Sequence, residues 1–408
     1  MPPPLRAVEC LGEIPIDRRG TRHGGPVTLP YFPVPPSSTD RSDLLREGER
    51  IMLVCNACRY CEGYCAVFPA MERRLRFSPG DLRYLANLCH DCGECLYACQ
   101  YAPPHAFAVN VPRTLAALRL ESYERYVWPA ALASAFGRHS AATSLGLAAA
   151  TILATLLVIA AAGTLAPPAA PADFYGVLPH GAMVALFGSV FAFALAALAV
   201  GVVRFRQDTM AREQGTADTR RGAALPWSAV RDALTLRNLH AHGTDCTYAG
   251  EEARTPWRRR FHHCTFYGFL LCFAATSVAA LYHMVFGWEA PYGYTSLPVL
   301  LGTAGGVGLV VGPAGLYWTG RTHDPDAADP AQRAPDRAFL LLLFLSSATG
   351  LVLLAWRNAA AMPALLVVHL GVVLALFLTL PYGKFVHGVY RMAALVQDAV
   401  ESRLAGSR

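Results

Sequence analysis

Charged residues are scarce in this 408-residue chain, and the shortage excludes an ordinary soluble globule for the whole of it. Asp, Glu, Lys and Arg make up 16% of the residues and hydrophobic residues 54%, whereas a typical soluble protein has about 25% charged residues. The mean hydropathy is +0.31. The net charge of +6 is too small to indicate a nucleic-acid partner. Part of the chain is therefore expected to lie in a lipid bilayer.

Signals of several other protein classes are also missing. Residues 1–43 are rich in Pro and Arg and contain no apolar run, so we expect an extended arm there and no secretory signal peptide. No glycine pattern lies in the context that binds a flavin or nicotinamide dinucleotide. The glycines of 296–318 instead favour close packing between helices. Neither an internal repeat nor a pair of interrupted helices indicates a carrier.

Cysteine, in contrast, is concentrated in two matched runs with the spacing Cys-x2-Cys-x2-Cys-x3-Cys. Bacterial ferredoxins use this spacing to hold iron–sulfur clusters, and the fourth cysteine of each run ligates the other cluster. We therefore predict two [4Fe–4S] clusters. The ligands of the first are Cys55, Cys58, Cys61 and Cys99, and those of the second are Cys89, Cys92, Cys95 and Cys65. Disulfides and structural zinc are the alternatives, but zinc sites usually come as two Cys-x2-Cys pairs.

The residues around the cysteines predict helices and not strands. Segments 42–53 and 114–128 have helical apolar spacing, and 66–88, between the runs, shows almost no strand-like alternation. The proline that follows the fourth cysteine in small ferredoxins is absent after both runs. A helical two-cluster ferredoxin domain is therefore predicted.

Six apolar segments of membrane-spanning length follow this domain. They lie at 141–163, 178–203, 262–286, 296–318, 337–356 and 362–385. The predicted fold class is mainly α, a helical two-cluster ferredoxin domain followed by a six-helix transmembrane bundle. The expected domains are an arm at 1–43, the cluster domain at 44–130, helices one and two at 138–205, a basic loop at 206–260, helices three to six at 261–390 and a tail at 391–408.

Loop charge predicts the orientation of the bundle. Segment 204–260 holds eleven Arg, whereas 164–177 and 287–295 hold no Lys or Arg. The positive-inside rule then places the cluster domain, the basic loop and both termini on the cytoplasmic side of a bacterial inner membrane. Because clusters are assembled on reduced thiols, the cysteines indicate the same side.

Histidines near the ends of two apolar segments are candidate haem b ligands, because ionisable side chains in membrane helices are costly and usually functional. His262 and His283 mark the ends of the third segment, and His369 and His387 those of the sixth. If these helices are antiparallel, His262 pairs with His387 and His283 with His369, and each pair can supply both axial positions of a haem. The alternative is a polar anchor at the membrane interface.

Helix phase supports these pairs in part. His369 and His387 are five turns apart on a continuous helix and would share one face, although Pro381 and Gly383 can bend it. His263 would point away from the face of His262. His180 has no evident partner, and His240 and His242 are expected in the soluble loop.

The cysteine runs, the sequence Asn-Val-Pro at 110–112 and the segment 257–273, which reads WRRRFHHCTFYGFLLCF, resemble the tricarballylate and citrate utilisation protein B family. The resemblance covers most of 45–395. It implies a membrane iron–sulfur partner that reoxidises the flavin of a separate FAD-dependent tricarballylate dehydrogenase. It supplies no haem ligands, so the histidine pairs depend on the helix arrangement alone.

The predicted function is electron transfer within an oxidoreductase complex and not stand-alone catalysis. Electrons pass from the reduced FAD dehydrogenase through two clusters and one or two b haems to a membrane quinone. Two alternatives stay open. The first is a redox enzyme component like a heterodisulfide reductase subunit or a precorrin-oxidising enzyme, and the second is a redox-coupled membrane carrier. Arg73, Arg74 and Arg76 are candidates for steering an acidic partner.

Overall fold

The fold is known from a computed structural model that describes residues 41–132, 141–161, 173–210, 226–237, 239, 256–321 and 325–406. Within these ranges the secondary structure is helical and contains no strand. A helical cysteine-rich domain precedes six long apolar helices, so the predicted fold class is confirmed. Most of the predicted N-terminal arm, with His240 and His242 of the basic loop, lies outside the described residues.

The cysteine-rich domain consists of helices whose ends are determined by local capping. They are α1 (Arg41–Cys58), α2 (Val67–Glu72), α3 (Pro79–Leu88), α4 (Glu94–Tyr97) and α5 (Val111–Tyr126). Ser78 accepts a hydrogen bond from the Asp81 amide, and the Asp81 side chain accepts one from the Ser78 amide. This capping box starts α3 where Pro79 occupies the first turn. All of α3 beyond its first residue is buried, so α3 is the centre of the domain.

Among the residues that the structure describes, six helices are long and apolar enough to cross a membrane. They are α7 (Ala141–Ala161), α9 (His180–Thr209), α11 (Trp257–Phe286), α12 (Leu297–Arg321), α13 (Pro330–Ala355) and α14 (Met362–Thr379). Shorter elements are α8 (Phe174–Val177), α10 (Trp227–Thr235) and η2 (Pro325–Ala327), and α15 (Val386–Gly406) follows the last long helix. Each predicted span has a counterpart among the six, and the architecture is compatible with a multi-pass membrane protein.

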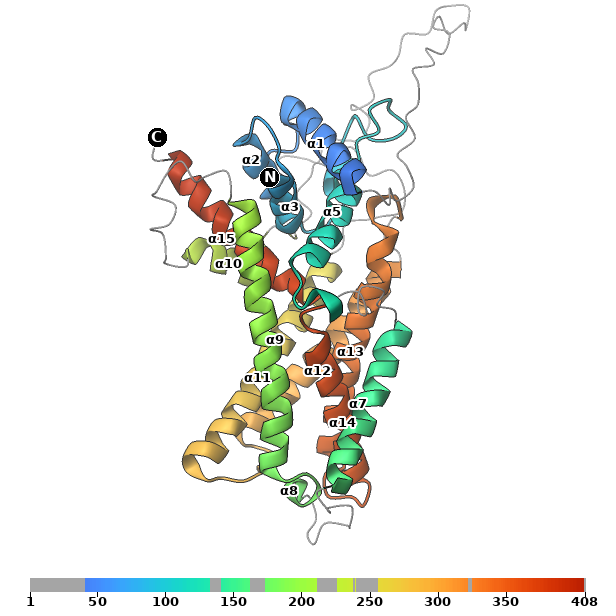
Figure 1. Cartoon of the computed structure of the whole chain (residues 1–408), viewed down its shortest axis with the longest axis vertical. Helices are drawn as coiled ribbons and strands as arrows, with labels where there is room; N and C mark the ends of the chain where they lie inside the picture. The colour runs from blue at the N-terminus through green and yellow to red at the C-terminus, as the bar shows by residue number, and fades with distance from the viewer. Residues whose placement is uncertain are drawn as a thin grey trace, which may run out of the picture.

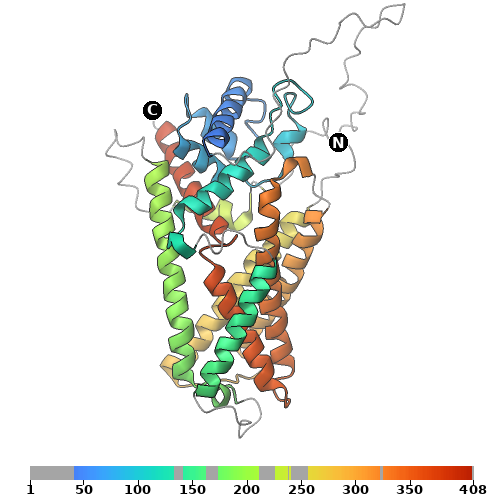
Figure 2. The ribbon, with the colours of Figure 1, turned by 45° about the vertical axis from the view of Figure 1, so that its right-hand side comes forward.

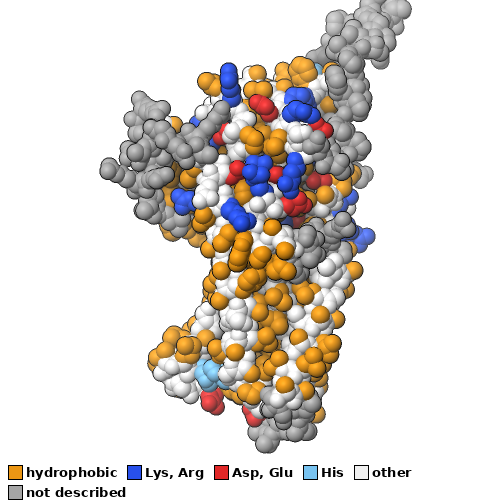
Figure 3. All heavy atoms as spheres, in the orientation of Figure 1, with side chains coloured by type: hydrophobic (Ala, Val, Ile, Leu, Met, Phe, Trp, Pro, Cys, Tyr) orange, Lys and Arg blue, Asp and Glu red, His pale blue; other side chains and the backbone are white. Residues whose placement is uncertain are grey.

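The cysteine-rich domain lies at one end of the long helices, together with α10 and α15, and α8 lies at the opposite end (Figure 1). The view turned by 45° shows the same two parts, with α9 running the length of the bundle (Figure 2). On the face drawn in Figure 3, Lys, Arg, Asp and Glu side chains gather over the domain, and hydrophobic side chains cover most of the long helices. This division matches a soluble domain seated on a membrane bundle.

Close contact between α11 and α12 depends on glycine. A Cβ added at Gly305 would lie 2.8 Å from the carbonyl oxygen of Gly268 and 2.7 Å from the amide nitrogen of Cys272. A Cβ at Gly312 would meet the Thr265 amide nitrogen at 2.6 Å. The glycine-rich segment therefore packs against its neighbour, as the sequence predicts.

The last helix is not a continuation of α14. Helix α14 ends at Thr379, and the amide of Gly383 donates to the Thr379 carbonyl (2.8 Å) in the turn that precedes α15. Pro381 has no amide hydrogen to continue the helix. The prediction that His369 and His387 share one face of a single helix is therefore wrong. The predicted boundary at 390 falls inside α15, which packs against α3, α9 and α10.

Candidate iron–sulfur site and its histidine junction

The first set of four cysteines combines the end of α1 with the end of the second cysteine run. Cys55, Cys58, Cys61 and Cys99 line one pocket. The thiols that act electrostatically on Cys55 are, in order of strength, Cys99, Cys61 and Cys58. Gln100, where small ferredoxins have proline, directs its side-chain amide at the Cys58 sulfur over 3.9 Å. The structure thus brings together the four cysteines that the crossed ferredoxin spacing predicts for one cluster.

The second set lies in an adjoining pocket. Cys65, Cys89, Cys92 and Cys95 line it together, and Cys95 also borders the first pocket. Cys92 and Cys89 act electrostatically on Cys65, and Cys92, Cys89 and Cys65 act on Cys95. Cys89 caps the C-terminus of α3 and Cys95 lies in α4. The two predicted sets of ligands are therefore adjacent.

Burial controls the ionisation of these thiols. It raises the pKa of Cys55, Cys61 and Cys92 to about 12, with smaller contributions in the same direction from Glu94 at Cys92 and from neighbouring cysteines at all three. The pKa values of Cys65 and Cys95 are raised well above the ordinary value for the same reason. The protein alone therefore does not stabilise thiolates here. Bound iron would supply the compensating charge and release the protons, so the buried four-sulfur sets fit iron–sulfur clusters.

The two pockets differ in their access to solvent. Tyr60 lines the first pocket and is 60% exposed. The second pocket contains Cys89, which is 7% exposed, and lies against Pro112 and Leu115 of α5. The first set is therefore nearer to solvent, and the second is nearer to the interior.

A group of histidines lies beside the second set. His90 directly follows Cys89, His262 lies in the first turns of α11, and His387 begins α15. Burial lowers the pKa of His90 well below its ordinary value, and Arg391, His387 and His262 act in the same direction. The structure thus brings His262 and His387 to the same end of the helices, as the sequence predicts.

The histidines of this group differ in whether a ring nitrogen has a hydrogen-bond partner. His387 Nδ1 is 3.3 Å from the Tyr123 hydroxyl. Within the described part of the chain, His262 Nδ1 and His90 Nε2 are buried without a hydrogen-bond partner. A metal-bound imidazole usually has its second nitrogen hydrogen-bonded, and His387 meets this condition.

The histidines at the opposite end are arranged differently from the prediction. The rings of His283 and His180 have centroids 3.8 Å apart at an angle of 30°, and Tyr175 lies against both rings. The statement that His180 has no partner is therefore wrong. A haem iron bound between two imidazoles would separate the ring centres by about 6 Å, given metal–nitrogen bonds of about 2.0 Å. The rings of His180 and His283 are closer than this, so they contact each other directly and leave no room for an iron between them.

His369, the predicted partner of His283, contacts α13. Its Nδ1 lies 3.1 Å from the Thr349 hydroxyl, and a Cβ added at Gly350 would lie 3.0 Å from its ring. The reason is helix adjacency, because α11 packs mainly against α12 whereas α14 packs against α7, α13 and α9. The sequence determines the depth of a residue in the bundle but not which helices are neighbours.

Arg73 and Arg74 are also engaged differently from the prediction. Arg73 forms ion pairs with Asp398 and Glu401, and Arg74 pairs with Glu401 at 2.7 Å and with Asp81 at 2.8 Å. Both arginines therefore attach α15 to α2 and α3. They do not form a free surface for steering a partner.

Several residues of the site have no role in the sequence prediction. His90 could have been found from its position inside the second cysteine run. Arg119, Arg391 and Tyr123 lie far from the cysteines in sequence, and no motif marks them. Their place beside the site follows only from the packing of α5 and α15 around α3.

The fold and the paired cysteine pockets define a helical protein whose two sets of four cysteines fit iron–sulfur clusters and whose long apolar helices are compatible with a multi-pass membrane protein. The family model described as Citrate utilization protein B matches residues 137–408, and the model of the Citrate utilization protein B Fer4-like domain matches residues 48–125. A curated relative, citrate utilization protein B of Escherichia coli, is 51% identical over 358 residues, which cover 88% of this chain and 92% of the relative.

This chain therefore belongs to the citrate utilization protein B family, and the resemblance stated from the sequence is confirmed. No solved structure matches the chain. A Fer4-like domain within this family fits an iron–sulfur electron-transfer role.

Proposed function

We propose that this protein is a membrane-bound electron-transfer subunit. It takes electrons from the reduced FAD of a separate dehydrogenase that acts on tricarballylate or a related tricarboxylate, and it delivers them to a membrane quinone. The observation that carries the proposal is the order of the groups in space. The cysteine pocket with the exposed rim adjoins the buried pocket, which lies beside His262 and His387 at the start of α11 and α15.

The two cysteine sets would hold one [4Fe–4S] cluster each, and such clusters supply one-electron transfer between a two-electron flavin and later acceptors. The chain itself provides four sulfur donors per pocket and buries Cys89 of the second. Cys95 borders both pockets, which keeps the path between them short. The arrangement requires no substrate pocket in this chain.

His262 and His387 are the proposed ligands of a haem b at the cluster end of the bundle. Tyr123 holds Nδ1 of His387 and thereby orients its other nitrogen. His369 has comparable support from Thr349. It is the candidate ligand of a second haem at the opposite end of the bundle.

The membrane proposed is the bacterial inner membrane, with the cluster domain on the cytoplasmic side. Arg204 and Arg206 lie near the end of α9, and Arg258, Arg259 and Arg260 lie in the first turn of α11. Both helix ends are at the end of the bundle that carries this domain (Figure 1), and the positive-inside rule assigns that end to the cytoplasm.

The test is made on the full-length protein purified anaerobically in detergent. About eight iron and about eight sulfide per chain are expected for two cubane clusters, with one or two haems from pyridine-haemochrome quantitation and a dithionite-reduced b-type spectrum. The reduced protein should be reoxidised by menadione. A protein that contains clusters but neither haem nor quinone reactivity would contradict the route through the histidines. Tricarballylate uptake into vesicles without quinone would favour a carrier instead.

A further inference from the structure

Three arginines from three helices hold the segment that carries Cys89. Arg119 of α5 donates through Nε to the carbonyl of Ala86 at 2.9 Å. Arg391 of α15 donates to the carbonyl of Leu88 at 2.6 Å, and Arg258 of α11 donates to that of Asp91 at 2.8 Å. The backbone on both sides of Cys89 is therefore surrounded by guanidinium groups.

Two of these cations are buried. Arg119 is 1% exposed and Arg391 is 7% exposed. Burial lowers the pKa of Arg391 to about 10, opposed by Cys89, Cys65 and Cys92, so Arg391 is still cationic at neutral pH. Burial also acts to lower the pKa of Arg119, and Cys89 opposes this effect more strongly than any other group. Both positive charges thus act on the second cysteine set, against the opposite effect of the Asp91 carboxylate on Cys89 and of the Glu94 carboxylate on Cys92.

Arg119 also has a donor that is not used. Its Nη2 is buried and has no hydrogen-bond partner among the described residues. A buried cationic donor without an acceptor is costly, and the absence of an acceptor indicates a ligand at this position. A thiolate or sulfide of a cluster is an anionic acceptor that would satisfy it.

The first cysteine set has a different environment. The pKa values of Cys55 and Cys61 are shifted by burial and by other cysteines. The pKa of Cys99 is shifted by burial, by Cys58 and by hydrogen bonds from two backbone amides. Its pocket is also more exposed, through Tyr60. The charge asymmetry between the two pockets is therefore built into the fold.

We propose that Arg119 and Arg391 raise the reduction potential of the cluster held by Cys65, Cys89, Cys92 and Cys95 above that of the cluster held by Cys55, Cys58, Cys61 and Cys99. The inference depends on the proposed function, because it requires both clusters. Reduction adds one negative charge to a cluster, and a nearby buried cation stabilises that charge. One electron then moves inward from the outer cluster, with no bond broken and no proton transferred, and collects beside His262 and His387.

The experiment is a redox titration of the full-length protein in nanodiscs, followed by electron paramagnetic resonance. C58S and C92S each alter the signal of one cluster and so assign the two midpoint potentials. In the unaltered protein, the higher potential should belong to the set that contains Cys92. R119Q and R391Q should each lower that potential and shift the partition of the electron between the clusters at least tenfold, which is about 59 mV for a one-electron couple.

Matched variants separate charge from structure. R119K and R391K retain the positive charge and should preserve most of the difference between the clusters. Arg83 is similarly buried, 3% exposed, but pairs with Glu121 and Asp208. R83Q should therefore leave the difference unchanged, although it perturbs the same domain.

A higher potential on the Cys58 set, or an unchanged difference in both Gln variants, would overturn the inference. If a Gln variant loses its cluster, two results still test the inference: which cluster has the higher potential in the unaltered protein, and whether the Lys variants preserve the difference between the clusters. A preparation without any iron–sulfur signal would instead refute the proposed function. Two clusters with equal potentials would refute only the role of the arginines.

Discussion

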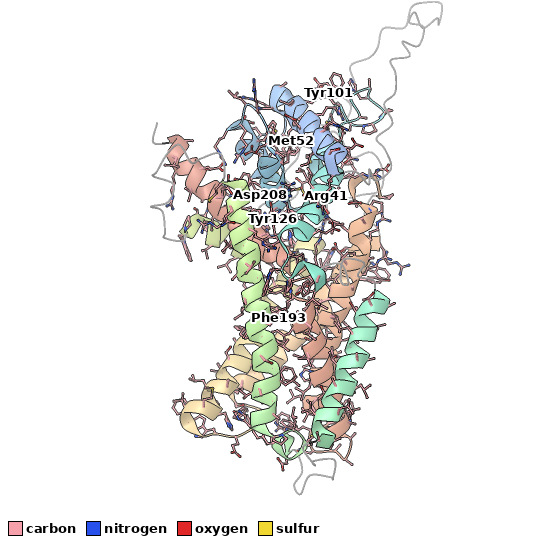
Figure 4. The ribbon with its side chains drawn as sticks, viewed as in Figure 1. Arg41, Met52, Tyr101, Tyr126, Phe193 and Asp208 are labelled. Carbon is pink, nitrogen blue, oxygen red and sulfur yellow. The ribbon has the colours of Figure 1, made fainter. Side chains whose placement is uncertain are left out.

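Tyr126 donates a 2.7 Å hydrogen bond to the carboxylate of Asp208, which connects the last residue of α5 to the end of α9. Figure 4 shows the two residues side by side at this junction. The same carboxylate accepts from Arg83 at 3.0 Å, and Arg83 also binds Glu121 at 2.7 Å. The cysteine-rich domain is thus joined to α9 by hydrogen bonds and an ion pair, which would help groups held by the domain to keep a fixed distance from groups in the bundle.

Asp208→Ala should loosen this junction. The change leaves the Tyr126 hydroxyl without its acceptor and removes one of the two carboxylates of Arg83, at a cost of about 1–3 kcal/mol. Thermal unfolding of the solubilised protein should shift to lower temperature, and limited proteolysis near 208 should accelerate. The control is Arg125→Ala. Arg125 is half exposed and 3.7 Å from Asp208, so its loss should cost less than about 1 kcal/mol, and an equal effect of both changes would contradict the prediction.

Glu401→Ala should detach α15 from the cluster domain. Glu401 is 7% exposed and accepts from both Arg73 and Arg74, and removal of one partner of a buried ion network costs about 3–5 kcal/mol. Hydrogen exchange of α15 amides should increase. Asp43→Ala breaks the exposed pair of Asp43 with Arg46 and should cost less than about 1 kcal/mol. Unchanged exchange in Glu401→Ala would show that α15 is held by apolar packing alone.

Gly305→Val should separate α11 from α12. Even the first added carbon would meet the Cys272 amide nitrogen at 2.7 Å, and backbone atoms cannot move aside at low cost. We expect a large fall in the melting temperature or in the yield of folded protein. Gly320→Ala is the control, because its added carbon meets nothing within 4 Å, and better helix propensity predicts no loss of stability. Equal behaviour of the two variants would argue against close helix contact.

Cys58→Ala and Cys92→Ala should each remove one cluster and leave the other. Iron per chain should fall from about eight to about four in each variant, because each cluster contains four iron atoms. The measurement is colorimetric iron and sulfide on the anaerobic protein. Cys264→Ala serves as the control, since Cys264 lies in α11 away from both cysteine sets. Loss of all iron in either single variant would show that the two clusters do not assemble independently.

His387→Ala should abolish haem binding at the cluster end of the bundle, whereas Tyr123→Phe should weaken it. Loss of the hydrogen bond to Nδ1 typically lowers metal affinity by about 10- to 100-fold. The difference spectrum and haem content of the purified variants provide the measurement. His263→Ala is the control, because His263 packs against Tyr267 on the same helix and should retain the full haem content. Haem unaffected by His387→Ala would exclude this residue as a ligand.

Features that depend on short stretches of sequence could be predicted without the structure. The six long apolar helices could be predicted from runs of apolar residues, because a helix satisfies its backbone groups internally and such a run gives it an apolar surface. The grouping of Cys99 with Cys55 and of Cys65 with Cys89 follows from the length of the cysteine spacings. The glycines of α12 were correctly assigned to helix packing because small side chains have few other uses in such a segment.

The predictions that were wrong concern how residues far apart in the chain are placed relative to one another. His369 and His387 are separated by a turn because Pro381 and Gly383 end α14, whereas the apolar pattern continues past it. His283 contacts His180 and not His369 because of which helices are neighbours in the bundle. Two residues at the same depth along the bundle need not lie on neighbouring helices.

The helical class, the number of long apolar helices and the two sets of four cysteines could be predicted from the sequence, since spacing and hydropathy are properties of short segments. What surrounds those sets depends on the tertiary fold. It placed Arg119 and Arg391 beside Cys89, engaged Arg73 and Arg74 with α15, and joined Tyr126 to Asp208. Such contacts join residues far apart in the chain, because burying α3 on all sides brings distant helices against it, and no local pattern encodes that packing.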